Sequence, residues 1–290
     1  MKKIILPILL VVSTQVFSQS FRLHIGGGFA NYLGDLQQKK YSFDQVKGAY
    51  SFGGAYDITD QIVLRADFSK GSVGGDDKKG NTKLQKRNLN FQSAITEVAL
   101  LVEYNWLNDY TGKFVPYAFT GLGAYKFNPY TFDNVGRKVF LHDLSTEGQG
   151  LTKYPNSKPY KLTQLNIPFG GGFKYNISST IFIAGEIGIR KLFTDYLDDV
   201  SSSFADRSEL LKAKGQVAVD LAFRGDELPP YTSAYPKGGS QRGNADGKDW
   251  YYFGQFRVSF KLSWRDGYGS RGASTGRKGF LRRLGCPGGF

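Results

Sequence analysis

The amino-acid sequence predicts an all-β fold: an eight-stranded antiparallel transmembrane β-barrel with long loops on one rim, short periplasmic turns on the other and a basic periplasmic C-terminal tail. Three observations predict it. Eight segments alternate apolar and polar side chains, as half-buried strands do. The connections between them alternate long and short. The chain also begins with an export signal, and beyond residue 20 it has no apolar run long enough for a transmembrane helix, so a membrane location would require strands.

Each strand segment has apolar side chains at about every second position, and we expect these to face lipid. The segments are 21–29, 50–58, 62–68, 98–106, 115–127, 165–175, 181–189 and 252–264. In the segment 115–127 the apolar set consists of Val115, Tyr117, Phe119, Tyr125 and Phe127. We assign this set to the lipid face, as in the other seven segments.

The connections between the segments have the lengths of a membrane barrel. They run over 31–48, 59–61, 71–92, 107–113, 128–160, 176–180 and 194–250, and long and short ones alternate throughout. Outer-membrane barrels have tight turns on the periplasmic rim and longer loops on the other. The alternation therefore predicts that both chain ends are periplasmic.

Charged side chains collect on the strand face opposite the apolar one. The carboxylates expected there are Glu97, Glu103 and Glu186, and the guanidinium groups facing them are Arg65, Arg190 and Arg257. An eight-stranded barrel is only wide enough for side chains to fill it, and an unpaired buried charge is costly. We therefore expect these groups to form ion pairs that close the barrel. A proton or ion pathway through them is the alternative.

Aromatic side chains separate a membrane barrel from a soluble, lipocalin-like barrel, in which the apolar face would point inward. Near the short-turn ends of the strands lie Tyr104, Trp106, Tyr175 and Trp264, and near the long-loop ends lie Tyr50, Phe127 and Tyr252. Two such groups are typical of the aromatic girdles at the two membrane interfaces. The placement favours the membrane barrel.

The two chain ends lie outside the predicted barrel, which spans residues 19–264. Residues 1–18 have two lysines before an apolar core and predict a cleaved signal peptide; an N-terminal membrane anchor, the alternative, needs a longer apolar run. The tail, residues 265–290, carries the docking candidates Arg265, Arg271, Arg277, Lys278, Arg282, Arg283 and Cys286. We expect it to dock on an acidic partner or on anionic lipid, a plain solvated tail being the alternative. An odd cysteine in an exported protein also predicts either an intermolecular disulfide through Cys286 or a free thiol there.

Two further features lie in the long loops. Residues 208–223 have apolar side chains at roughly helical spacing, so a short helix over the barrel mouth and an irregular loop are both compatible with the sequence. The acidic pairs Asp76-Asp77 and Asp198-Asp199 lack a following series of ligands, so we interpret them as loop residues and not as a cation site.

The composition argues against several functional classes. The net charge of +13 lies mostly in the signal peptide, the tail and the loop 71–92, so no nucleic-acid partner is needed to explain it. One cysteine and two histidines exclude an internal disulfide framework and a Cys/His zinc cluster. His24 and His142 have no nucleophile at a recognisable spacing, and the chain has no catalytic motif. We therefore expect no enzymatic activity, cofactor or metal, although an outer-membrane esterase or protease stays an alternative.

Several blocks of the sequence resemble the PorG family of outer-membrane barrels. They are NYLGDL at 31–36, FVPYAFTGLGAYKFNP at 114–129, LSTEGQG at 144–150, QLNIPFGGGFKY at 164–175, RKLFTDYLDDVS at 190–201 and the terminal Cys286-Pro287. The resemblance implies a location in the outer membrane and a role in the type IX secretion system. There the barrel would anchor or position the periplasmic ring of the lipoprotein PorK and of PorN, and so support protein export and gliding motility. The competing interpretation is an independent small barrel of the OmpX/OmpA type, whose loops serve adhesion or surface protection.

Overall fold

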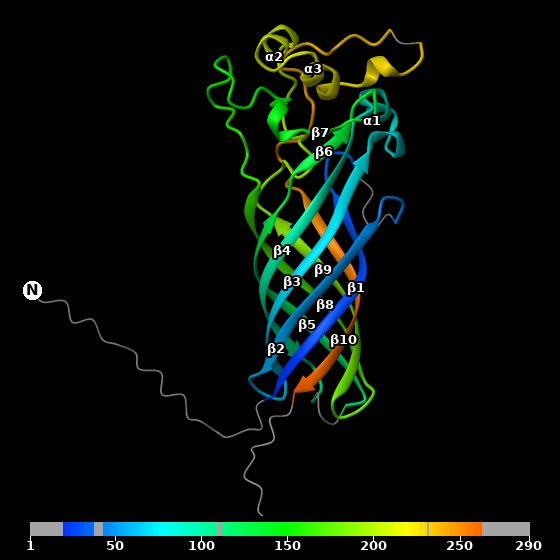
Figure 1. Ribbon diagram of the computed structural model, residues 1–290, viewed down its shortest axis with the longest axis vertical. Coiled ribbons are helices and arrows are strands. Elements are labelled where there is room, and N and C mark those ends of the chain that lie inside the picture. The colour runs from blue at the N-terminus through cyan, green and yellow to red at the C-terminus, as the bar shows by residue number, and fades with distance from the viewer. Residues whose placement is uncertain (1–19, 38–42, 109–111, 231, 263–290) are drawn as a thin grey trace, which may run out of the picture.

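The computed structural model describes residues 20–37, 43–108, 112–230 and 232–262, and within them eight long strands close into a barrel (Figure 1). These strands are β1 (Phe21–Leu33), β2 (Lys47–Asp57), β3 (Ile62–Asp76), β4 (Asn90–Asn105), β5 (Phe114–Lys126), β8 (Thr163–Asn176), β9 (Ile181–Leu192) and β10 (Trp250–Leu262). The expected signal peptide, Trp264 and the tail lie outside the described residues.

Every neighbouring pair of barrel strands is antiparallel, in the order β1-β2-β3-β4-β5-β8-β9-β10. The barrel closes because β1 also pairs with β10, with Phe21 opposite Leu262 at one end and Leu33 opposite Trp250 at the other. The predicted eight-stranded antiparallel barrel is therefore confirmed. None of the helices in the described ranges is long and apolar enough to cross a membrane.

Short and long connections lie at opposite rims. The short ones cover 58–61, 106–113 and 177–180, and the long ones cover 34–46, 77–89, 127–162 and 193–249. The long ones form a cap over one end of the barrel, while β1 begins and β10 ends at the short-turn rim (Figure 1). The cap contains β6 (Pro129–Phe132), β7 (Lys138–Phe140), α1 (Thr82–Arg87), α2 (Arg207–Lys214), α3 (Gln216–Ala222) and the 3₁₀ helices η1 (Asp77–Lys79), η2 (His142–Leu144) and η3 (Gly225–Glu227).

The segment 208–223 is helical, but it forms two short helices. Asp206 caps α2 by accepting hydrogen bonds from the amides of Ser208 and Glu209, and Gly215 separates α2 from α3. Gly215 has φ +83°, a conformation that a residue with a Cβ adopts only at a cost, so the helical periodicity is interrupted there.

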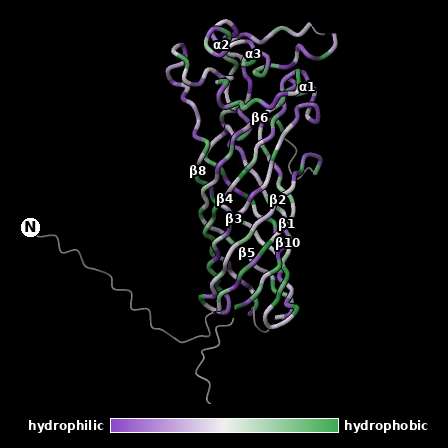
Figure 2. The backbone as a smooth tube through the Cα atoms, in the orientation of Figure 1, coloured by the Kyte–Doolittle hydropathy of each residue, from purple (hydrophilic) through white to green (hydrophobic). Residues whose placement is uncertain are grey.

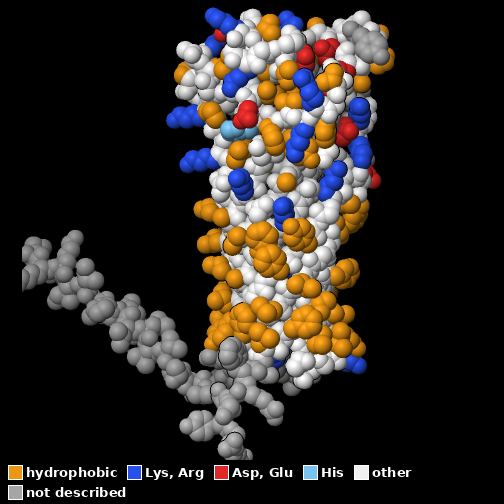
Figure 3. Space-filling model, in the orientation of Figure 1, with side chains coloured by type: hydrophobic (Ala, Val, Ile, Leu, Met, Phe, Trp, Pro, Cys, Tyr) orange, Lys and Arg blue, Asp and Glu red, His pale blue; other side chains and the backbone are white. Residues whose placement is uncertain are grey.

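The barrel wall is apolar outside and polar inside on most strands. On seven of the eight strands the alternating apolar set is the exposed one, as predicted; examples are Ile25, Phe52, Leu100 and Ile187. Figure 3 shows these side chains gathered around the barrel on its short-turn side, with Lys and Arg side chains above them. Figure 2 shows hydrophilic stretches concentrated in the cap.

The assignment of β5 to the lipid face is wrong. The side chains Val115, Tyr117, Phe119, Tyr125 and Phe127 are at most 5 % exposed and point into the barrel, so Phe127 also does not belong to an aromatic girdle. The outward set contains Phe114 and Leu122, which are 54 % and 72 % exposed. Both faces of this segment are apolar, so its periodicity alone does not decide which face is inside.

Candidate functional site

The barrel interior holds as many buried acidic as basic side chains among the residues of its described strands. The basic ones are Arg22, Arg65, Lys174, Arg190 and Arg257, and the acidic ones are Asp57, Asp67, Glu97, Glu103 and Glu186. Alternation along the strands explains their position, because the opposite face of each strand is apolar and faces outward. The five positive and five negative charges balance, as burial in a narrow interior requires.

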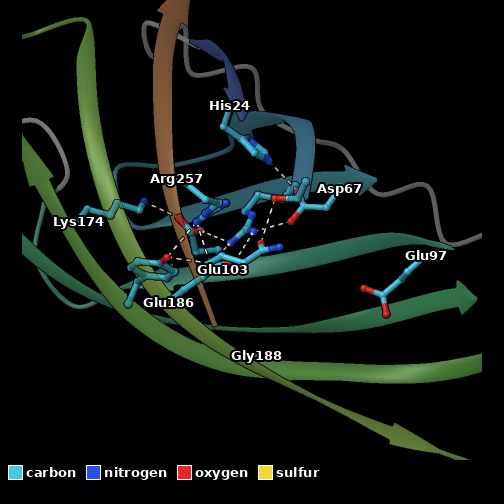
Figure 4. Close-up of polar contacts among 12 residues, drawn as sticks. His24, Asp67, Glu97, Glu103, Lys174, Glu186, Gly188 and Arg257 are labelled. Atoms are coloured by element: carbon cyan, nitrogen blue, oxygen red, sulfur yellow. Dashed lines mark hydrogen bonds and ion pairs between the residues drawn. The ribbon is translucent and has the colours of Figure 1, made fainter. Parts of the chain in front are cut away.

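Arg65 on β3 is the centre of this network. Figure 4 shows its partners Asp67, Glu103 and Glu186 close together inside the barrel. Its guanidinium donates to Asp67 at 2.5 Å, to Glu103 on β4 at 2.9 Å and to Glu186 on β9 at 3.2 Å. Arg257 on β10 lies 2.9 Å from the same Glu186. The network therefore connects strands on opposite sides of the barrel.

Lys174 and Tyr117 also join this network. The Lys174 ammonium lies 2.5 Å from Glu103 and donates to the Asn105 side chain at 2.9 Å. The Tyr117 hydroxyl donates to Glu186 at 2.8 Å and accepts from Arg257 at 2.9 Å. Hydrogen bonds of this kind to charged groups are the strong ones, so the network holds its side chains in fixed positions.

Glu97 and Arg190 form a separate pair nearer the cap, and Figure 4 shows Glu97 apart from the other carboxylates. Their charged atoms are 3.0 Å apart, and Glu97 also accepts from Asn166 at 2.8 Å and from Tyr251 at 2.5 Å. Gly188 makes room for the pair, because a Cβ there would lie 2.5 Å from a guanidinium nitrogen of Arg190. All six predicted interior residues are thus placed inside the barrel, in two groups.

Sequence reasoning missed three contacts of this interior. Arg22 pairs with Asp57 near the short-turn rim. His24, which has no catalytic partner recognisable in the sequence, points inward with its Nε2 3.0 Å from Asp67. The Lys174–Glu103 pair was also not predicted, although Lys174 falls on the inward face of β8. The inward position was readable from the alternation in each case, but the partner lies on another strand, 35 or more residues away in the chain.

Aromatic rings on β5 fill the space around the ion pairs. The Arg65 guanidinium lies 5.2 Å from the centre of the Phe119 ring, and Lys174 lies 5.1 Å from the centre of Tyr117. Arg65 and Tyr117 are among the largest fully buried side chains of the described protein. The middle of the barrel is therefore packed with paired charges and rings, as expected for a barrel of eight strands.

A second cluster of buried charges lies at the mouth of the barrel, under the cap. It is built from three of the sequence blocks singled out above, 31–36, 144–150 and 190–201, together with residues near the start of β10. We call it the mouth cluster and define it as Tyr32, Asp35, Glu147, Asp195, Asp198, Asp199, Arg242 and Asp249. Most of these side chains are almost fully buried.

Glu147 and Asp199 join the blocks 144–150 and 190–201. Glu147 accepts from the amides of Ser201 and Ser202 at 2.9 and 3.0 Å. Asp199 accepts from the Thr146 hydroxyl at 2.6 Å. The Arg242 guanidinium lies 3.1 Å from the Glu147 carboxylate and 3.7 Å from that of Asp199. Its positive charge therefore offsets negative charge on both. The pair Asp198-Asp199 is thus a structural element of the mouth.

The other carboxylates of the mouth cluster rely mainly on uncharged donors. Asp198 accepts from the Tyr32 hydroxyl and the Val200 amide, and Asp249 accepts from the Leu197 amide at 2.9 Å. Burial and the neighbouring acids raise the pKa of Asp198 and of Asp249 well above its usual range. Burial, with the charge of Asp35 adding to it, raises the pKa of Asp195 to about 7.

The cap also contains a cavity of about 480 Å³. It lies between α1 and the long connection before β10, and its lining includes Leu84, Phe204, Phe223, Lys83, Lys86 and Asn244. This volume is in the range of small-ligand sites. Within the described ranges, no group of three or more His, Cys, Asp and Glu side chains is arranged to hold a metal ion.

We predict that Glu103→Gln destabilises the barrel by about 3–5 kcal/mol, because it leaves Arg65, Lys174 and Arg257 with too few buried counter-charges. The measurement is equilibrium unfolding in urea of protein folded into lipid vesicles. Glu209→Gln is the matched control: its ion pair with Lys153 is exposed to solvent, so the change should stay within about 1 kcal/mol. Equal stability of Glu103→Gln and wild type would contradict the role of the network.

We predict that the cap becomes less stable as the pH rises from about 4 to 7. The folded pKa of Asp195 is about 7 and its unfolded pKa about 4, so the folded cap binds more protons in this interval and loses stability as they leave. Asp195→Asn removes this ionisation and should raise the amide protection factors of residues 195–201 at pH 8 by about tenfold or more.

The measurement is hydrogen exchange corrected for intrinsic rates at pH 5 and pH 8. Asp246→Asn, which changes an exposed carboxylate of the same connection, should leave the pH dependence of the protection factors as in wild type. Protection that is equal at both pH values in wild type would contradict the assignment of the raised pKa to Asp195.

Comparison with known proteins agrees with a membrane barrel. Three solved structures that resemble the chain are Neisserial surface protein A (9 % identity, 83 % of this chain and 97 % of that one, TM-score 0.41), Ail of Yersinia pestis bound to the heparin analogue sucrose octasulfate (9 %, 85 % and 100 %, 0.41) and OprG of Pseudomonas aeruginosa (12 %, 83 % and 97 %, 0.40). No curated protein sequence matches. The model of the outer membrane protein beta-barrel domain matches residues 4–223, most of the chain. The chain therefore belongs to the outer membrane protein beta-barrel domain family, and its place is the outer membrane.

Proposed function

We propose that this outer-membrane barrel is a non-enzymatic anchor that positions the periplasmic ring of the type IX secretion system. The ring proteins would be those that resemble PorK, a lipoprotein, and PorN. The observation that carries the proposal is that the described barrel begins and ends at its short-turn rim, with Phe21 opposite Leu262. Both ends of the described barrel thus lie on the side opposite the cap (Figure 1).

The charge of the C-terminal segment supports docking at that rim. Residues 265–290 contain six Lys and Arg and one Asp, and they begin three positions after Leu262, the last residue of β10. If the short-turn rim is periplasmic, as is usual for such barrels, this segment meets the periplasmic partner first. Residues 1–18 would be removed during export. In this proposal the basic side chains of the tail, Arg265 to Arg283, bind an acidic face of the ring.

The packed interior favours a function as an anchor and argues against transport of molecules through the barrel. The ion pairs around Arg65 and the rings of Tyr117 and Phe119 occupy the middle of the barrel. A protein that holds a partner needs an outer surface and no channel. Moreover, the blocks 31–36, 144–150 and 190–201, which carry much of the resemblance to PorG, meet in the mouth cluster and belong to one structural unit.

A second candidate function has an observation in its favour. The cap is folded, with buried ion pairs such as Arg87–Asp77, and it contains the cavity of about 480 Å³. A rigid, hollowed surface on the loop side suits an independent barrel of the OmpX/OmpA type whose loops serve adhesion or surface protection. The two candidate functions use opposite rims: the anchor uses the short-turn rim, and adhesion or surface protection uses the cap.

We predict that the solubilised full-length protein retains the periplasmic ring proteins in a pull-down and that the protein lacking residues 265–290 does not. The reason is the loss of the positive charge at the short-turn rim. A matched control replaces two exposed cap lysines, Lys212→Gln/Lys237→Gln, and should retain the ring proteins. Loss of the ring in the control, or its retention without the tail, would contradict docking through the tail.

We also predict an intermolecular disulfide through Cys286, the single cysteine of the chain. Non-reducing gels of membranes should show a higher-mass species in wild type that is absent in Cys286→Ser. The same species should disappear from wild type on reduction. Identical migration of wild type and Cys286→Ser without reductant would exclude the disulfide.

The packed interior predicts that the protein, inserted into a planar bilayer, gives no large steady conductance. Paired side chains occupy the lumen at the level of Arg65, which leaves no wide aqueous path there. A large and steady current would contradict the anchor proposal in favour of a pore.

A further inference from the structure

The outward face of the barrel has an unusual distribution of charge. Among the described strands it carries Lys70 on β3, Lys126 on β5 and Lys191 on β9, all exposed. The one carboxylate on this face is Asp76, at the last position of β3. Lys161, which is also exposed, comes two residues before β8 and continues its outward alternation. We call Lys70, Lys126, Lys161 and Lys191 the lysine belt.

The lysine belt lies at the border of the apolar band on the cap side. Along β3 the outward residues run Ile62, Leu64, Ala66, Phe68 and then Lys70, and along β9 they end with Ile187, Ile189 and then Lys191. Figure 3 shows the same boundary, with blue side chains directly above the orange band. The ammonium groups are thus at the height where hydrocarbon gives way to headgroups.

The strand register brings part of the belt together. Lys70 is opposite Thr96, Thr96 is opposite Lys126, and Lys126 is opposite Thr163. All four side chains face outward. Since neighbouring strands are about 4.8 Å apart, Lys70 and Lys126 are separated by about 10 Å at their Cα atoms, with a threonine hydroxyl between them. Two flexible lysine stems bridge such a gap, so both ammonium groups reach one anion.

The belt lysines have no counter-charge of their own. None of the four takes part in an ion pair with any residue in the described part of the chain, whereas Lys153 in the cap lies 3.7 Å from Glu209. Inside the barrel every buried charge is compensated. The uncompensated positive charge at the headgroup level is therefore directed outward.

We propose that the lysine belt binds the phosphate groups of lipid headgroups in the membrane leaflet on the cap side, with Lys70, Thr96 and Lys126 forming the strongest site. A phosphate accepts hydrogen bonds from both ammonium groups and from the threonine hydroxyl. The site is built by strand register on the barrel wall and is independent of the tail, so it gives the barrel a preferred depth and a selected lipid shell.

The test uses the full-length protein in phosphatidylcholine vesicles containing spin-labelled phosphatidic acid or spin-labelled phosphatidylcholine. Electron paramagnetic resonance gives the fraction of each label immobilised at the protein surface, and hence their relative association constant. Wild type should prefer phosphatidic acid, and Lys70→Gln/Lys126→Gln should lower the preference by about fivefold for each lysine removed. Lys212→Gln/Lys237→Gln, in the cap and away from the band, should keep the wild-type preference.

Three results would overturn the proposal. Equal association of both labels with wild type would mean that the lysine side chains extend into the polar interface without binding a lipid phosphate. An equal loss of preference in the cap-lysine control would mean that total charge, and not the belt, is responsible. Competition by inorganic phosphate at physiological ionic strength would indicate a site for a free anion instead of a lipid headgroup. The variants are compared only as folded barrels, identified by their heat-dependent migration on gels.

Discussion

The compensation of the Arg65 charge inside the barrel is the constraint on which the rest of the structure depends. In hydrocarbon, the outer wall must be apolar, and alternation then forces the polar side chains inward. A guanidinium in this narrow space is tolerable only with carboxylates around it, and Arg65 has three within 3.2 Å, from Asp67, Glu103 and Glu186. Because these come from β3, β4 and β9, the ion pairs specify which strands face each other across the barrel.

The same constraint determines strand register. A slip of one residue along a strand with inward charges would move those charges to the lipid face and its apolar set to the interior. For β4 this would expose both Glu97 and Glu103 to hydrocarbon and remove the partners of Arg190 and Lys174. The interior network therefore selects against alternative pairings. Glycines at the closest points, such as Gly188 beside Arg190, provide the space that the bulky charged groups need.

The same argument explains which strand orientations could be predicted from the sequence and which could not. Strands with inward charges have one face that cannot point to lipid, so their orientation was readable from Arg65, Glu103 or Glu186. The segment 115–125 has no charge, and both of its faces are apolar. Its inward face is decided only by the packing of Phe119 and Tyr117 against charges from other strands.

The mouth cluster was beyond sequence reasoning for a related reason. Asp198 and Asp199 look like an isolated acidic pair, because their partners are remote in the chain: Tyr32 is 166 residues from Asp198, and Thr146 is 53 residues from Asp199. Only closure of the barrel, which places β1 beside β10, brings the blocks 31–36 and 190–201 together. The sequence therefore predicted only loop residues here, whereas the burial of these carboxylates and the identity of their partners are properties of the topology.

The two closed regions together limit what this protein can do. The lumen is filled by its own ion pairs and rings, and the mouth is filled by the hydrogen-bonded carboxylates under the cap. Interactions with other molecules must therefore use outer surfaces: the lipid-facing wall with the lysine belt, the hollowed cap, and the rim where the barrel begins and ends. A positively charged border at the headgroup level and a rigid interior both resist movement of the barrel through the bilayer. In the proposed anchor, a load applied at the short-turn rim would pass to the membrane through this packed barrel.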